Sequence, residues 1–193
     1  MKNLGLFFDT ETTAIPDFKA PSESEHQPHI VQLAALLVDL DTEQTIQSMD
    51  VIIRPDGWTI TQELTNIHGI TQEMAMDIGV SEKLAVDMFL QLWNRRPRMA
   101  FNSTFDNRII RIALKRFFDE SIVDSWHEGA QGVEWQCQMI AARKIMGGKQ
   151  PTLAEAYKHF TGNELENAHS AIADTKACMD IYFSIKKTQE NAI

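Results

Sequence analysis

The sequence predicts an α/β domain with a mixed β-sheet. Its first third shows the patterns of three strands, and the remainder alternates helical patterns with one short strand. Strands that alternate with helices are typical of sheets covered by helices. With 193 residues the chain can bury a substantial core, and we expect a single domain over residues 1–193. No internal repeat or linker indicates a second domain.

The three expected strands lie in the first 54 residues. Leu4–Thr10 is a short apolar run bounded by polar residues, which is typical of a buried strand. Thr12–His29 holds three prolines and predicts a long, exposed loop. Ile30–Leu40 and Thr45–Arg54 are two further apolar segments joined by a polar turn. We expect them to form a hairpin.

Helices dominate the rest of the chain. Thr61–His68 predicts a short helix that ends at Gly69, a residue common at helix C-termini. Thr71 and Ser81 are suited to cap the next two helices, the second of which runs to about Asn94. The segment 119–134 lacks clear periodicity, so no element is predicted there. The remaining elements are a short strand at Arg98–Asn102 and helices at Phe105–Phe118, Gln138–Met146, Thr152–Phe160 and Ser170–Lys187.

Charge and composition restrict the class of protein. A net charge of −9 argues against a protein that coats nucleic acid through a broad basic face. It is compatible with an enzyme that holds a few nucleotides at a metal site. Cys137 and Cys178 are too few for a disulfide framework and fit buried thiols in a reducing cytoplasm. Gln32 and Asp39 interrupt the longest apolar segment, so we expect a soluble protein with no membrane span.

Four carboxylates fall at expected ends of secondary structure. Asp9 and Glu11 end the first strand, and side chains two apart on a strand point to the same side. Asp106 follows the short strand, although an acid in a first helical turn also suits the helix dipole alone. His169 and Asp174 are five apart, which is about 140° on one helix. A joint role therefore requires His169 to lie in the loop before the helix.

The carboxylates together predict a metal site. All four are reachable from one end of the sheet, where they would repel one another unless cations were bound. Two divalent cations would neutralise them. Sites rich in oxygen ligands favour Mg²⁺ or Mn²⁺ over zinc, and no cluster of Cys and His indicates a softer metal.

In this order the residues resemble the DEDDh exonucleases, an RNase H-like family that includes the proofreading epsilon subunit of bacterial DNA polymerase III. Shorter connecting segments, among them 66–71 and 141–144, resemble the family as well, and the resemblance covers roughly residues 4–185. The three motifs that carry it are Phe7-Phe8-Asp9-Thr10-Glu11-Thr12-Thr13, Asn102-Ser103-Thr104-Phe105-Asp106 and His169-Ser170-Ala171-Ile172-Ala173-Asp174.

The resemblance implies an RNase H-like mixed sheet flanked by helices and a metal-dependent 3′→5′ exonuclease. Its metal ligands would be Asp9, Glu11, Asp106 and Asp174, holding two Mg²⁺ for which Mn²⁺ can substitute. His169 would be the general base that takes a proton from the attacking water. Nucleoside monophosphates would leave one at a time from the 3′ end.

Substrate contacts are also implied by the resemblance. Glu63 and His68 match a glutamate and a histidine that the family places against the terminal nucleotide, with Ile67 packing on its base. Glu63 could equally be a solvated helix residue, and His68 a residue before the glycine cap. Asn102 would contact the substrate backbone, or else make an ordinary hydrogen bond at the strand end. Thr10, within the first motif, is the remaining candidate for substrate binding.

The expected substrate is DNA with single-stranded or frayed 3′ ends, because the resemblance is closest to polymerase-associated members. Two alternatives are an exoribonuclease of the same family and a noncatalytic module that binds nucleic acid or a polymerase. The intact catalytic residues argue against the noncatalytic module. A polymerase partner would have to contact the globular surface. Basic residues on the helix after Asp106 either follow phosphates or form a solvated face, and such runs usually form a solvated face: Arg108, Arg111, Lys115 and Arg116.

Overall fold

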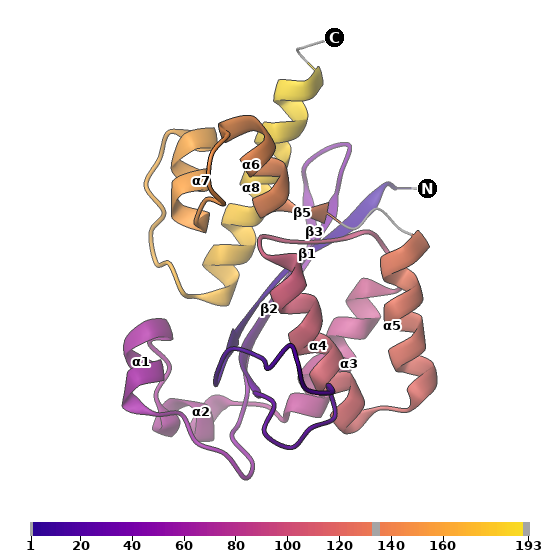
Figure 1. Cartoon of the computed structure of the whole chain (residues 1–193), viewed down its shortest axis with the longest axis vertical. Coiled ribbons are helices and arrows are strands. Elements are labelled where there is room, and N and C mark those ends of the chain that lie inside the picture. The colour runs from indigo at the N-terminus through magenta and orange to yellow at the C-terminus, as the bar shows by residue number, and fades with distance from the viewer. Residues whose placement is uncertain (1, 133–135, 191–193) are drawn as a thin grey trace.

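A mixed five-stranded sheet forms the centre of the computed structural model, which describes residues 2–132 and 136–190 (Figure 1). The strand order in this part of the chain is β3-β2-β1-β4-β5. The first three strands pair antiparallel, whereas β4 pairs parallel with β1 and with β5. The predicted mixed sheet is therefore confirmed. The strands are β1 (Leu4–Thr12), β2 (Ile30–Asp39), β3 (Thr45–Ile52), β4 (Arg98–Ala100) and β5 (Gln136–Cys137).

Helices cover both faces of the sheet. The third to fifth helices pack on one face and the sixth to eighth on the other, so β2 is buried along its whole length. None of the helices within the described ranges has the length and apolar character needed to cross a bilayer. The helices are α1 (Gln62–His68), α2 (Gln72–Ile78), α3 (Glu82–Trp93), α4 (Ser103–Phe117), α5 (Glu120–Gly132), α6 (Gln138–Met146), α7 (Leu153–Thr161) and α8 (Ala171–Glu190).

Strand β1 supplies the framework of the site. It lies between β2 and β4, so its carboxyl end is in the middle of the sheet. Phe7 packs in the core under α8, with its ring centroid 5.3 Å from that of Tyr182, whereas Leu6 and Phe8 belong to the opposite core. Because residues two apart share a face, Asp9 and Glu11 are on the α8 side.

The predicted helix ends are confirmed where capping chemistry was used. The hydroxyls of Thr61, Thr71 and Ser81 each accept a hydrogen bond from a backbone N–H in the first turn of the following helix. Gly69 has a φ of 76°, the left-handed conformation that glycine adopts without a steric penalty. Asn94, the residue that follows α3, is also left-handed.

Helix α5 was not predicted. Its buried residues Val123 and Trp126 pack against the core, where Trp126 contacts Phe89 and Trp93 at centroid distances of 5.8 Å and 4.9 Å. Few apolar residues carry this contact, so the sequence shows little periodicity. The last two residues of the unassigned stretch, 133 and 134, lie outside the described residues.

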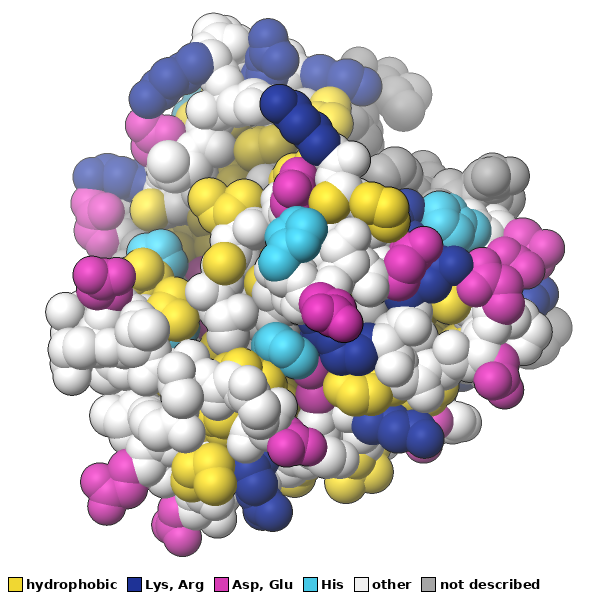
Figure 2. Space-filling view, turned by 60° about the horizontal axis from the view of Figure 1, so that its bottom comes forward, with side chains coloured by type: hydrophobic (Ala, Val, Ile, Leu, Met, Phe, Trp, Pro, Cys, Tyr) yellow, Lys and Arg dark blue, Asp and Glu magenta, His cyan; other side chains and the backbone are white. Residues whose placement is uncertain are grey.

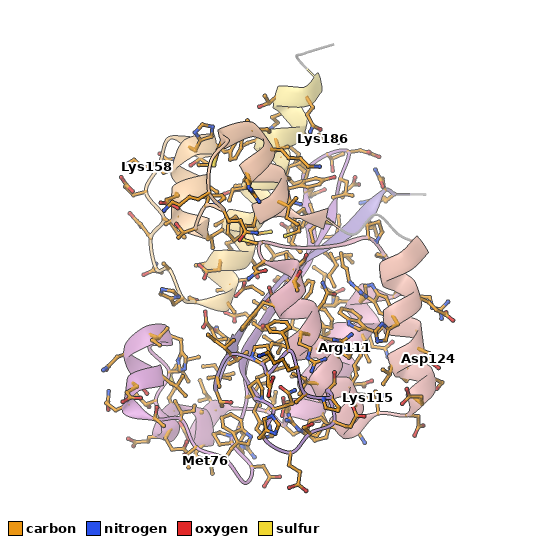
Figure 3. All side chains as sticks on the ribbon, viewed as in Figure 1. Met76, Arg111, Lys115, Asp124, Lys158 and Lys186 are labelled. Atoms are coloured by element: carbon orange, nitrogen blue, oxygen red, sulfur yellow. The ribbon has the colours of Figure 1, made fainter. Side chains whose placement is uncertain are left out.

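The segment 13–29 is less exposed than expected. Pro16, Ser22, Gln27 and Pro28 are buried, and three arginines of α4 hold the segment. Side chains at positions 108, 111 and 116 donate hydrogen bonds to backbone carbonyls or to a hydroxyl at positions 17, 20, 22, 27 and 28. The interpretation of these arginines as a solvated helix face is therefore wrong. Figure 3 shows one of them, Arg111, on α4 beside this segment.

Candidate active site

Four carboxylates from three elements meet at the carboxyl end of β1. Asp9 and Glu11 come from β1, Asp106 from the first turn of α4, and Asp174 from the first turn of α8. Burial raises the pKa of Asp9 well above its ordinary value, and the charges of Asp106, Asp174 and Glu11 raise it further. The predicted convergence of these side chains is what the structure shows.

Asp106 is the most buried of the four carboxylates. Its side chain is 2% exposed, and burial raises its pKa to about 7. Its Oδ1 accepts hydrogen bonds from the backbone N–H of Thr10 at 3.1 Å and from the Thr10 hydroxyl at 2.8 Å, which oppose that rise. Thr10 is itself buried, so it holds Asp106 in place. A contact between Thr10 and substrate stays a prediction.

Glu11, Asp174 and His169 form the open side of the cluster. One carboxylate or ring atom from each lies within 4.8 Å of the others. Burial raises the pKa of Glu11 to about 8, and the charges of Asp174 and Asp106 add to this. Burial also raises the pKa of Asp174 to about 6, against a lowering by the hydrogen bond from the His169 backbone.

His169 lies in the loop before α8, as predicted. The helix begins at Ala171, and the His169 side chain is exposed. Its backbone N–H donates to Asp174 Oδ2 at 3.3 Å, and its φ of 67° is left-handed. A non-glycine residue in that region costs free energy and persists only where surrounding contacts hold it. The contact with Asp174 therefore ties the position of His169 to the carboxylates.

Gln32 on β2 is a site residue that the sequence reasoning missed. Its Oε1 accepts from the backbone N–H of Ala171 at 3.1 Å, and its Nε2 donates to Asp50 Oδ1 at 2.7 Å. It is buried and pairs across the strands with Glu11. Gln32 thus fixes the start of α8 relative to β1. A polar residue inside an otherwise apolar strand was the available signal.

The cluster suits a hard divalent cation. All ligand atoms from the four acids are carboxylate oxygens, the donors that Mg²⁺ and Mn²⁺ prefer. Asp174 Oδ1 is buried and has no hydrogen-bond partner in the described part of the chain. Burial is the largest cause of the raised pKa values of Asp9 and Glu11, and repulsion between the carboxylates, which a bound cation would relieve, adds to it.

The predicted substrate-binding residues of α1 differ in their exposure to solvent. His68 is buried, and its Nδ1 accepts from the backbone N–H of Ile70 at 3.1 Å. Its Nε2 is buried without a partner among the described residues, and its pKa is lowered by burial and by the charge of His169. The structure therefore brings the two histidines close together. Ile67 and Glu63 are exposed on the same helix, and no described contact joins them to the carboxylates.

Asn102 precedes α4 at the N-cap position. Its carbonyl accepts from the backbone N–H of Phe105 at 2.9 Å, but its side chain makes no capping hydrogen bond. The side chain is exposed next to the turn that carries Asp106. The exposed amide is thus available to a ligand.

Charges on the face shown in Figure 2 are mixed. Lys and Arg side chains alternate with Asp and Glu side chains and form no broad basic patch there. This distribution agrees with the net charge of −9. Binding of a polyanion on this face would have to be local.

Comparison with solved structures shows the same fold in several exonucleases. E. coli Exonuclease I in complex with a dT13 oligonucleotide has a TM-score of 0.77 and 21% identity, covering 99% of this chain and 42% of that chain. The nuclease domain of 3′hExo, a DEDDh family member bound to rAMP, has a TM-score of 0.71 and 14% identity over 98% of this chain and 93% of that domain. Cell-death related nuclease 4 has a TM-score of 0.69 and 14% identity, covering 97% and 64%.

The chain thus spans about two fifths of the length of Exonuclease I. A comparison with curated protein sequences found no match. The sequence model of the exonuclease family (RNase T) matches residues 6–182, which include all four carboxylates and His169. On that match and on the fold, this chain belongs to the RNase T or DEDDh exonuclease family, whose members are phosphodiester hydrolases.

Proposed function

We propose that this protein is a metal-dependent 3′→5′ exonuclease that releases nucleoside monophosphates from single-stranded or frayed 3′ ends of DNA. The observation that carries the proposal is the meeting of four carboxylates with His169 at the end of β1. Family membership supplies the reaction class, a phosphodiester hydrolysis. The residue roles and the substrate are our inference.

Asp9, Glu11, Asp106 and Asp174 would hold two Mg²⁺ or Mn²⁺ ions. When bound, such ions polarise the scissile phosphate and make the attacking water more acidic. The carboxylates supply the ligand oxygens, and neighbouring residues hold these oxygens in position before substrate arrives. Thr10 does this for Asp106, and the Gln32 link to Ala171 does it for the turn that carries Asp174.

His169 would act as the general base. A neutral imidazole has a ring nitrogen that can take a proton from water, which is why histidine often serves as a general base. The exposed ring is within 4.8 Å of the Glu11 and Asp174 carboxylates, where a proton taken from water can leave to solvent. Its backbone hydrogen bond to Asp174 ties its position to the metal ligands.

The terminal nucleotide would lie between α1 and the His169 loop. His68 Nε2 supports this placement, since it is a buried polar atom without a described partner close to His169. Ile67 is 53% exposed and offers an apolar surface for the terminal base. Glu63 would accept a hydrogen bond from the sugar hydroxyl, and the exposed Asn102 would contact the backbone.

DNA is favoured as the substrate by the oligonucleotide complexes of Exonuclease I, a structural relative. The structure of 3′hExo with rAMP supports the alternative, an exoribonuclease of the same family. The likeness to the polymerase epsilon subunit, a polymerase partner and a proofreading role stay predictions from sequence.

The test is degradation of a 5′-labelled single-stranded DNA oligonucleotide with Mg²⁺, Mn²⁺ or EDTA, beside an RNA of the same sequence. We expect a metal-dependent ladder that shortens from the 3′ end, faster on DNA. His169→Ala removes the proposed base, and loss of a general base costs about 10²–10⁴-fold in rate. His159→Ala, a change at an exposed histidine of α7, is the matched control and keeps full activity.

Each other result has a defined meaning. A faster ladder on RNA would replace DNA with RNA in the proposal. Equal rates for wild type and His169→Ala would remove His169 from the role of general base. No ladder on either strand, with the wild type folded, would overturn the exonuclease and favour the noncatalytic binding module.

A further inference from the structure

A pocket lined by three arginines lies on the far side of α4 from the carboxylates. It has a volume of about 270 Å³ and is lined by Arg98, Thr104, Asn107, Arg108, Arg111, Trp126 and His127. Positions 107, 108 and 111 are three to four residues apart and share one helix face. Asp106 faces β1 through its contact with Thr10, so the pocket is separate from the candidate active site.

Three guanidinium groups line this pocket, and none of them pairs with a carboxylate in the described part of the chain. Arginines in a protein of net charge −9 usually have acidic partners nearby. Burial lowers the pKa of Arg98 to about 9, and burial together with the charge of Arg108 lowers the pKa of Arg111. Three arginines therefore line the pocket with no carboxylate oxygen of the described residues within 4.0 Å of their guanidinium nitrogens.

Arg98 has hydrogen-bonding groups that the protein leaves unused. It is 2% exposed, and its guanidinium carbon lies 3.4 Å from the centre of the Trp126 ring. Its Nη2 donates to the Trp126 carbonyl at 3.1 Å, but Nε and Nη1 have no partner among the described residues. Stacking explains where the guanidinium plane lies. It does not satisfy these two N–H groups, and an unmade hydrogen bond at a buried donor costs free energy.

The other two arginines are each only partly used. Arg108 is 8% exposed and holds the segment 13–29 through Nη2, while its Nε is buried without a described partner. Arg111 donates through Nε to the Ser22 hydroxyl, and its Nη1 lies 3.4 Å from His127 Nε2. The hydrogen bonds to the segment 13–29 therefore use Nη2 of Arg108 and Nε of Arg111. Both residues line the pocket together with Arg98.

We propose that this pocket binds a phosphate group, carried either by the nucleic acid strand or by a free phosphate monoester. Guanidinium groups present planar pairs of N–H donors that match phosphate oxygens, which distinguishes arginine from lysine at such sites. A bound phosphate would supply both the missing negative charge and acceptors for the unpaired donors. The inference does not depend on the catalytic assignment, because the pocket lies on the opposite side of α4.

The direct test is titration of the metal-free protein with inorganic phosphate in EDTA, against chloride at equal ionic strength. EDTA prevents divalent cations from bringing phosphate to the carboxylates. Binding is followed by calorimetry and by tryptophan fluorescence, since Trp126 stacks on Arg98. Arg111→Gln is the test variant, because this side chain is less buried than Arg98 and its loss is less disruptive to folding. Arg95→Gln, an exposed arginine that contacts α5 outside the pocket, is the control with the same charge change.

We expect phosphate to bind the wild type and Arg95→Gln alike, and Arg111→Gln about tenfold more weakly, as loss of one charge-assisted contact implies. His127→Gln tests the rim of the same pocket, and we expect it to lower the affinity for phosphate as well. A second arm measures binding of single-stranded oligonucleotides of three and twelve nucleotides in EDTA. A loss of affinity for the twelve-nucleotide strand alone in Arg111→Gln would identify a strand phosphate as the ligand.

Unchanged oligonucleotide affinity with weakened phosphate binding would identify a free phosphate or monoester. The proposal is overturned if Arg111→Gln and Arg95→Gln bind phosphate and both oligonucleotides equally well. It is also overturned if neither ligand binds the folded wild type. Both outcomes leave the exonuclease assay unaffected, so failure here is distinguishable from failure of the proposed function.

Discussion

Replacing Asp106 by asparagine is expected to stabilise the metal-free protein at pH 8. The pKa of Asp106 rises from 3.8 to about 7 on folding, chiefly by burial. The stability that the neutral carboxyl provides is present below pH 4 and is lost as the pH rises through about 7. A change from 3.8 to about 7 corresponds to a loss of about 4 kcal/mol. Asparagine does not titrate and avoids this loss.

The substitution carries a cost of its own. The side-chain oxygen of asparagine can still accept both hydrogen bonds from Thr10, but its amide NH₂ replaces the second carboxylate oxygen, for which no hydrogen bond is described, in a buried site. An unsatisfied buried polar group costs about 1–3 kcal/mol. The net gain at pH 8 is therefore about 2 kcal/mol, or about 4–8 °C in Tm for a protein of this size. Near pH 4 the gain disappears, because this pH is close to the unfolded pKa of 3.8 and little of the wild type's loss has yet developed.

The assay is urea denaturation in EDTA at pH 4.5, 6 and 8 for wild type, Asp106→Asn and Asp87→Asn. Asp87 is an exposed residue of α3 outside the carboxylate cluster, and its change tests the effect of removing any one negative charge. A stability difference between wild type and Asp106→Asn that does not grow from pH 4.5 to 8 would refute the reasoning. So would an equal gain from Asp87→Asn. Added Mg²⁺ is expected to reduce the difference, since it stabilises the wild-type carboxylates.

Three further predictions test the site and its supports. Mg²⁺ at one hundred times its Kd is expected to stabilise the wild type by about 2.7 kcal/mol in thermal unfolding and Asp9→Ala by less; equal shifts in both proteins would argue against the proposed ligands. Gln32→Leu breaks the link from β2 to the start of α8. We expect kcat to fall by about tenfold or more with little change in KM, as for other residues that orient a site. An unchanged kcat in a folded variant would assign Gln32 a purely structural role. Arg116→Met frees the carbonyls that end the segment 13–29, a loss of about 1.5–3 kcal/mol. Trypsin is then expected to cut after Lys19 about tenfold faster in limited proteolysis, and an unchanged rate would show that the segment is held elsewhere.

Local chemistry was sufficient for most of the elements. The hydroxyl of Thr61 marks the start of α1 and Gly69 marks its end, because capping depends on residues within one turn of the helix end. The alternation of side chains on β1 was likewise enough to put Asp9 and Glu11 on one side. The position of His169 before α8 followed from helix geometry, since residues five apart cannot share a face.

Contacts between distant segments could not be read in this way. Helix α5 is held mainly by Val123 and Trp126, and such a sparse pattern becomes recognisable only against the core that it meets. The segment 13–29 was expected to be exposed because its composition is polar and rich in proline. Its anchors are arginines about ninety residues later in the chain, and composition carries no information about that pairing.

By itself, then, the sequence determined the α/β class, the identity of the carboxylates and the loop position of His169, because each depends on residue type and short-range spacing. Only the tertiary structure decided that Gln32 holds the start of α8, that Thr10 holds Asp106, and that three arginines meet without an acid. The physical reason is the same in all three cases. Hydrogen bonding, burial and charge interactions depend on which side chains meet in space. For residues far apart in the sequence, those distances exist only in the folded chain.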